Sequence, residues 1–97
     1  MIGMKIQEFI EKAYYGDEVE FVLHDTTYFM QGYKINNRYV LTVDYWNKTD
    51  GSEPEHDYLF QIDCDSQHER MFLFESAHIF GGKTIYEVES EITVVYG

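Results

Sequence analysis

Cysteine is almost absent from this chain, and its scarcity limits the chemistry that the chain can perform. Cys64 is the only cysteine among 97 residues, which excludes a disulfide within the chain and a four-cysteine zinc site. Asp63 and Asp65 flank it, and neighbouring carboxylates disfavour the negatively charged thiolate that a cysteine nucleophile needs. We therefore expect no cysteine-based catalysis and no enzyme activity.

Proline and long apolar stretches are equally rare. The chain has one proline, no glycine- or serine-rich linker, and no apolar run near the roughly 18 residues that a membrane-spanning helix needs. Its first residues also lack the basic segment followed by an apolar segment that marks a secretory signal. These absences predict one α+β domain over residues 1–97 and a cytoplasmic location.

Positive charge is the third shortage. The chain has 18 Asp and Glu residues against 7 Lys and Arg residues, which gives a formal net charge of −11. Such a field repels DNA, RNA and anionic lipid, and it attracts basic surfaces over a distance. The charge therefore serves either solubility alone or the binding of a strongly positive partner.

The segment Arg38–Trp46 has the period-two pattern of a strand. Because strand side chains alternate between the two faces of a sheet, one set is predicted to face the core and the other the outer surface. β-branched and aromatic residues dominate the segment, as is typical of strands. We predict that it is the central strand of a small antiparallel sheet. The core set is Tyr39, Leu41, Val43 and Tyr45, and the outer set is Arg38, Val40, Thr42, Asp44 and Trp46.

The preceding strand, Tyr28–Ile35, is connected to this segment by Asn36-Asn37. Asn tolerates positive φ, so a type I′ turn is predicted, and the turn fixes the register. Gly32 then lies opposite Leu41, where the missing side chain leaves room for a helix or marks a bulge. The second apolar face of this hairpin needs a cover of its own or serves as a binding surface. The other predicted pairs are Ile35 with Arg38, Met30 with Val43 and Tyr28 with Tyr45.

Helices and further strands surround this hairpin. Apolar residues at helical spacing predict a helix over Lys5–Tyr15, ending at Gly16, with its stripe facing the core or, alternatively, a partner. Capping-box spacing predicts helices at Gln67–Ala77 and Thr84–Glu91, with a buried strand as the alternative for Met71–Phe74. The remaining predictions are strands at Val19–His24, Asp57–Asp63 and Ile92–Tyr96, and a turn at Asp25-Thr26-Thr27. The predicted fold class is α+β, a four- or five-stranded antiparallel sheet with an N-terminal helix and one or two C-terminal helices.

Two short motifs point to ligands, but both are incomplete. Gly82-Lys83-Thr84 matches the end of a phosphate-binding loop, although Ala77 occupies the position of the first glycine. The second motif combines the Asp63-Cys64-Asp65 run with His68, whereas zinc ligands usually come from two separated pairs. We expect a helix N-cap at the first motif and solvated acids at the second. No catalytic, cofactor-binding or metal-binding residue is predicted.

The stretch Ala77–Ile92 contains Gly81-Gly82-Lys83-Thr84 followed by an acidic run. It resembles the C-terminal signature of small, acidic, uncharacterised proteins of Gram-positive bacteria and their mobile elements, in which a Gly-Lys-Ser/Thr turn leads into a short acidic helix. The likeness covers less than a quarter of the chain, and Gly81 stands where the pattern has a polar residue. The resemblance implies a small α+β domain and no established activity.

Acidic residues are concentrated in stretches that contain no Lys or Arg, above all between Lys48 and Arg70. Carboxylates spaced along strands and loops imitate the phosphates of nucleic acid, and a protein that presents them occupies basic grooves. Two aromatic residues, Tyr33 and Trp46, fall on the outer face of the same sheet. The predicted partner-binding surface consists of Tyr33, Asp44, Trp46, Asp50, Glu53, Glu55, Asp57, Asp63 and Asp65.

These features favour a small acidic protein without enzyme activity that binds a basic protein surface. The leading hypothesis is an inhibitor or immunity-type protein of a phage or mobile element that blocks a nucleic-acid-binding enzyme by nucleic-acid mimicry. Anti-CRISPR proteins are an analogy based on size and charge alone. The first alternative is a structural or regulatory protein whose acidity serves solubility only, and a further one is a small hydrolase or metal-binder. No direct binding of nucleic acid or membrane is expected.

Overall fold

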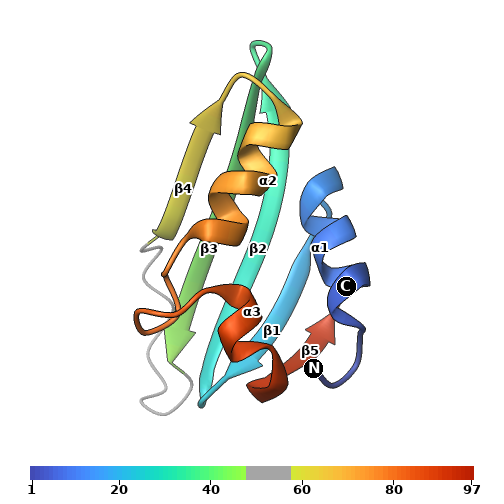
Figure 1. Cartoon of the computed structure of the whole chain (residues 1–97), viewed down its shortest axis with the longest axis vertical. Helices are drawn as coiled ribbons and strands as arrows, with labels where there is room; N and C mark the ends of the chain where they lie inside the picture. The colour runs from blue at the N-terminus through green and yellow to red at the C-terminus, as the bar shows by residue number, and fades with distance from the viewer. Residues whose placement is uncertain (48–57) are drawn as a thin grey trace.

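The computed structural model describes residues 1–47 and 58–97, except for the side chains of residues 46, 47, 58 and 59. Over this part of the chain, helices lie on one face of a five-stranded antiparallel sheet, so the predicted α+β fold class is confirmed (Figure 1). The strands are β1 (Val19–Leu23), β2 (Thr26–Ile35), β3 (Arg38–Asn47), β4 (Tyr58–Cys64) and β5 (Ile92–Tyr96), in the order β4-β3-β2-β1-β5. The helices are α1 (Ile6–Tyr15), α2 (Gln67–Ser76) and α3 (Ile85–Val88), followed by a 3₁₀ turn, η1, at Glu89–Glu91.

The hairpin of β2 and β3 has the predicted turn and register. Asn36 and Asn37 have φ angles of 51° and 62°, as a type I′ turn requires. All the predicted pairs occur, namely Ile35–Arg38, Gly32–Leu41, Met30–Val43 and Tyr28–Tyr45. A two-residue turn with positive φ at both positions thus fixes the pairing along both strands.

The turn between β1 and β2 differs from the prediction of Asp25-Thr26-Thr27. It consists of His24 and Asp25, with φ angles of 49° and 64°, while both threonines belong to β2. Thr26 pairs with Leu23, the last residue of β1. The reason is that β-branched threonine favours a strand, whereas His and Asp are among the residues that tolerate positive φ.

Capping residues mark the helix ends. Gly16, with φ of 76°, ends α1, and the Ser66 hydroxyl at the start of α2 accepts a hydrogen bond from the backbone N–H of Glu69. Thr84 and Glu87 form a full capping box at α3, in which each side chain accepts from the other residue's backbone N–H. The Gly-Lys-Thr sequence is therefore the start of a helix, as predicted.

The helices are shorter than the sequence predicted. The apolar run Met71–Phe74 lies within α2, so the strand alternative for it is wrong, and α2 ends at Ser76 instead of Ala77. The predicted helix Thr84–Glu91 divides into α3 and η1. None of the helices within the described residues has the length and apolar character needed to cross a membrane.

The hydrophobic core lies between the helices and one face of the sheet. Its aromatic centre includes an edge-to-face pair of Phe9 and Phe21, whose ring centres are 5.3 Å apart. The buried helix residues are Phe9 and Ala13 of α1, Met71 and Phe74 of α2, and Ile85 and Val88 of α3. They pack against sheet residues that include Val19, Phe21, Leu23, Met30, Leu41, Val43 and Ile92.

The strand Arg38–Trp46 is not the central one, because β2 occupies the middle of the sheet. The predicted division of β3 into core and outer residues also holds only in part. Leu41 and Val43 are buried as predicted, but Tyr45 is 40% exposed and lies beyond a register shift in the ladder with β4. On the other face Val40 and Thr42, which were predicted to be outer residues, are buried as well.

The edge of the sheet at β5 is partly covered by the start of the chain. Ile2 forms a parallel bridge with Thr93, in which the Ile2 N–H donates to the Ile92 carbonyl and the Val94 N–H donates to the Ile2 carbonyl. Gly3 follows with φ of 89°, and a Cβ there would lie 2.7 Å from the Val94 carbonyl oxygen. The start of the chain therefore satisfies backbone groups that an edge strand leaves unpaired.

Candidate partner-binding surface

The sheet face opposite the helices, called the open face below, carries no helix in the described part of the chain (Figure 1). Phe29, Tyr33 and Ile35 of β2 form an apolar row on it, which the polar Gln31 interrupts. Phe29 is half-buried, and Tyr33 and Ile35 are 44% and 53% exposed. The register places Asp44 opposite Phe29 and Arg38 opposite Ile35. An exposed apolar row bordered by charged groups is typical of an interaction surface.

Three of the predicted partner-binding residues share this open face. Tyr33 on β2 and Asp63 on β4 both pair with Val40, and half-buried Asp44 lies on β3. Asp65 follows β4 and contacts Arg38 at the end of the β2–β3 hairpin. Trp46 pairs with Thr27 through its backbone. The side chain of Trp46 and the residues Asp50, Glu53, Glu55 and Asp57 lie outside the described part of the chain.

Arg38 partly neutralises two of the predicted acids. Its Nε donates to Asp63 Oδ1 at 2.7 Å, and its Nη1 donates to Asp65 Oδ1. The hydrogen bond to Asp63 is the main cause that raises the pKa of Arg38. These acids have no cation near them in the sequence, but the neighbouring strand supplies one. The side chains of Asp63 and Asp65 remain 57% and 82% exposed, so both carboxylates stay accessible to a partner.

The second arginine, Arg70 on α2, is buried, with 3% of its surface exposed. Its guanidinium donates to the carbonyl oxygens of Val40 at 3.2 Å and Tyr14 at 2.6 Å, and it lies 5.6 Å from the centre of the Tyr39 ring. Among the described residues no carboxylate pairs with it. Burial is the main cause that lowers the pKa of Arg70. Carbonyl dipoles and an aromatic face thus take the place of a counterion.

Gly32 provides the space for this guanidinium. A Cβ on Gly32 would lie 2.9 Å from Arg70 Nη1 and 2.8 Å from Gly16 Cα. The Gly32 N–H also donates to the Gly16 carbonyl at 3.1 Å, while the ladder with β3 stays in register. The prediction that Gly32 leaves room for a helix is therefore confirmed, and no bulge occurs there.

The candidate metal ligands have other partners. The Cys64 thiol donates to the carbonyl oxygens of Tyr39 and Ser66, and His68 Nδ1 lies 3.4 Å from the Tyr14 hydroxyl. Asp63 and Asp65 contact Arg38, as described above. No group of three or more His, Cys, Asp or Glu residues in the described ranges could hold a metal ion.

Neither arginine offers a free positive charge at the surface. Arg70 is buried, and Arg38 is shared between two carboxylates. Apart from the pair of His24 with Glu91, most described acids form no ion pair. They are spread over both faces and the loops: Glu8, Glu11, Asp17, Glu18, Glu20, Asp25, Glu69, Glu75, Glu87 and Glu89. Long-range attraction of a basic partner follows from this imbalance.

Sequence reasoning missed the role of Arg70. No role was predicted for Arg70, yet it is buried on α2 together with Met71 and Phe74. That i, i+1, i+4 spacing, together with a glycine inside a neighbouring strand, was the signal in the sequence that could have indicated burial of Arg70.

Comparison of the chain with protein-family models, with curated proteins and with solved structures gives no match.

Proposed function

We propose that this protein acts without catalysis, by binding a basic surface of another protein through its open face. The observation that carries the proposal is the apolar row ending in Tyr33 and Ile35, which no helix covers in the described residues and which acids border. Aromatic side chains supply much of the affinity at the centre of interfaces, while charges accelerate the encounter. The apolar residues are therefore expected to determine the dissociation rate, and the carboxylates the association rate.

The partner class that fits this surface is a protein with a Lys- and Arg-rich groove, such as a nucleic-acid-binding enzyme. Carboxylates along β3, β4 and the segment between them occupy such a groove in place of phosphates. An inhibitor or immunity-type role for a phage or mobile element is the corresponding biological setting. A cytoplasmic location belongs to the same proposal, and a single buried cysteine is compatible with a reducing compartment.

The test starts from proteins encoded beside this chain, purified and assayed for binding by surface plasmon resonance at low and high salt. Replacing Tyr33 by Ala is expected to speed dissociation about tenfold or more, because an aromatic hot spot contributes mainly to the lifetime of a complex. Tyr86→Ala is the matched control, since Tyr86 is 46% exposed on α3 and lies away from the open face. Equal effects of the two variants would contradict the assignment of the open face.

The electrostatic component is tested by charge reversal. Glu53→Lys combined with Glu55→Lys is expected to slow association and flatten its salt dependence. Asp17→Lys combined with Glu18→Lys makes the same change in net charge between α1 and β1 and is expected to alter association less. Competition with duplex DNA for the partner then tests mimicry. Binding that is the same at low and high salt would instead favour the alternative in which acidity serves solubility only.

A further inference from the structure

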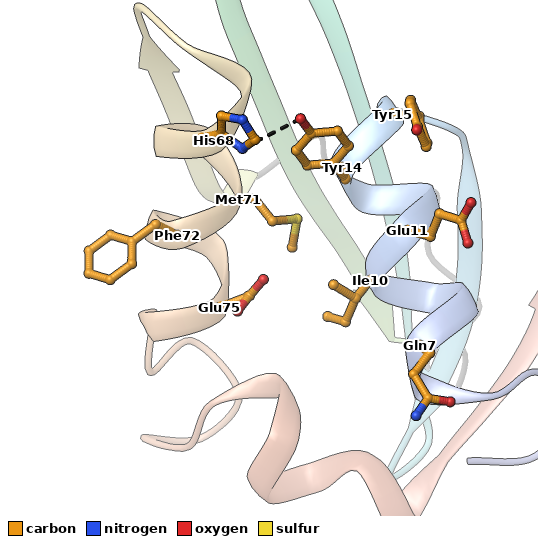
Figure 2. A pocket seen from close by; sticks show the side chains of 9 residues that line it. All are labelled: Gln7, Ile10, Glu11, Tyr14, Tyr15, His68, Met71, Phe72 and Glu75. Atoms are coloured by element: carbon orange, nitrogen blue, oxygen red, sulfur yellow. Dashed lines mark hydrogen bonds between the residues drawn. The ribbon is translucent and has the colours of Figure 1, made fainter.

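A groove of about 540 Å³ separates α1 from α2 on the helix-covered side of the molecule (Figure 2). Its walls include Ile10 and Glu11 of α1 and Met71 and Glu75 of α2. Figure 2 shows Ile10, Met71 and Glu75 directed into the space between the two helices, whereas Phe72 points away from it. The groove thus lies on the opposite side of the sheet from the open face.

The two helices are fixed to each other at one end of this groove. The Tyr14 carbonyl oxygen accepts hydrogen bonds from Gln67 Nε2 at 2.7 Å and Arg70 Nη2 at 2.6 Å, and the Tyr14 hydroxyl lies 3.4 Å from His68 Nδ1. Figure 2 shows Tyr14 beside His68 at this end, with the helices well separated at the other. Because the joined end includes a buried arginine, the groove is preformed and needs little rearrangement to accept a ligand.

The apolar stripe of α1 explains why the groove exists. Phe9 and Ala13 are buried against the sheet, but Ile10 and Tyr14 on the flank of the stripe are only half-buried. Across the gap, Met71 lines the floor of the groove but belongs to the core and is only 7% exposed, so the accessible apolar surface comes from Ile10 and Tyr14. The stripe is therefore wider than the sheet can cover, and its remainder lines the groove.

The charge of the groove is negative. Glu11 and half-buried Glu75 line it, and none of its lining residues is a Lys or an Arg. Glu75 also interacts with Tyr86 of α3, where burial and then the Glu75 carboxylate raise the pKa of the tyrosine. A half-buried carboxylate beside apolar side chains lies in a poorly solvated environment, in which an incoming cation is attracted more strongly than at an open surface.

We propose that this groove binds a helical segment of a partner protein that carries an apolar row flanked by Lys or Arg. A third helix placed between two others is a common recognition mode, with anchors at i, i+3, i+4 and i+7. Its apolar row contacts Ile10 and Tyr14, and a cation on its flank reaches Glu75, which Figure 2 shows directed into the groove. The inference is independent of the function proposed above, because the groove and the open face lie on different sides of the sheet.

The probe is a synthetic, fluorescein-labelled amphipathic helix of Leu and Lys, titrated by fluorescence anisotropy against the whole protein. Two control peptides accompany it, one with the same composition but no apolar row and one with every Lys replaced by Glu. We expect saturable one-to-one binding of the first peptide only. The composition-matched control is expected to bind at least about tenfold more weakly, and the Glu peptide not to bind.

Protein variants locate the site. Glu75→Gln is expected to weaken binding of the Leu/Lys peptide about tenfold, because it removes the half-buried carboxylate while keeping its shape. Glu69→Gln makes the same change on an exposed part of α2 outside the groove and is expected to leave binding nearly unchanged. Ile10→Ser is expected to weaken binding as well, and a melting curve verifies that each variant is folded.

Several results would overturn the proposal. If Glu75→Gln and Glu69→Gln weakened peptide binding equally, the peptide would be attracted by the net negative charge of the protein and not by the groove. Binding of the composition-matched peptide with the same affinity as the amphipathic one would lead to the same conclusion. Binding of the Glu peptide would mean that charge plays no part. Self-association of the protein that blocks the peptide would make a second copy the occupant. Loss of binding in Tyr33→Ala would place the peptide on the open face instead.

Discussion

The two arginines of this protein lie on opposite faces of the same sheet and illustrate two uses of a positive charge. Arg70 is buried among the helices and is held by backbone carbonyl oxygens and an aromatic ring. Arg38 is exposed at the end of the hairpin and is held by two carboxylates. The buried one organises the junction of α1, α2 and β2, whereas the exposed one adjusts the charge of a surface. The predictions below test this difference.

The largest effect is expected at Arg70. Arg70→Ala should lower the free energy of unfolding by about 3 kcal/mol, because it removes the hydrogen bonds to the Val40 and Tyr14 carbonyl oxygens and creates a cavity. Arg70→Met, which fills most of the space but donates no hydrogen bond, should cost less. Urea denaturation measures both variants. A loss below about 1 kcal/mol for Arg70→Ala would mean that the guanidinium is not a structural element.

Gly32→Ala tests the same junction from the strand side. Its Cβ would overlap Gly16 Cα and the Arg70 guanidinium, so we expect the free energy of unfolding to fall by about 2 kcal/mol. Gly81→Ala is the comparison variant, since nothing lies within 4 Å of a Cβ there and only its positive φ opposes alanine. Its expected cost is about 1 kcal/mol. If both variants cost the same, crowding at Gly32 is not the cause.

Thr84→Ala removes the cap of α3, on the covered side of the sheet. The substitution should cost about 1 kcal/mol at neutral pH, because the backbone N–H of Glu87 loses the side-chain acceptor of the cap and keeps only the Thr84 carbonyl oxygen.

The contribution of Glu87 to this cap depends on pH. A hydrogen bond from the Thr84 backbone N–H lowers the pKa of the Glu87 carboxyl in the folded protein. The resulting stabilisation is therefore complete above the usual pKa of the carboxyl, and it is lost as the pH falls through the lowered pKa. Glu87→Gln should therefore destabilise the protein at pH 7 and make little difference at strongly acidic pH, as measured by denaturation across pH.

The smallest effect on stability is expected at Arg38. Arg38→Gln removes exposed ion pairs, which contribute little to folding, so its denaturation midpoint should stay close to that of the wild type. Its consequence should instead appear in binding, because Asp63 and Asp65 lose their cation and the open face becomes more negative. Association with a basic partner should become faster at low salt. A large loss of stability would remove the contrast with Arg70.

The local parts of the fold could be predicted from the sequence because their causes are local. Asn36-Asn37 determined a turn type, and the turn determined which residues pair along two strands. The capping spacing of Thr84 and Glu87 likewise located a helix start. Such features depend on a few neighbouring residues, whose backbone preferences act before any tertiary contact forms.

Non-local features could not be derived in the same way. β5, at the far end of the chain, pairs with β1 and extends the sheet on that side, so that β2 and not β3 is the central strand. The pairing of Arg38 with Asp63 and Asp65 depends on β4 lying beside β3. Because these acids are far from Arg38 along the sequence, the sequence indicated that no cation lies near them. For the candidate site, strand alternation placed Tyr33 and Asp44 on one face of the hairpin, as the register shows. The groove between α1 and α2 could not be derived in this way, because it depends on how far apart two helices lie.

The pairing of the first strand with the last one also has a consequence for the rate of folding. β1, β2 and β3 are joined by two-residue turns, so they can pair without closing a long loop. β5 must close a loop that contains most of the chain before Ile92 meets Leu23. Long-range pairing of this kind slows folding. We expect the meander of the first three strands to form early and the addition of β5 to be the slow step, so that β5 is also the strand that separates first when the protein opens.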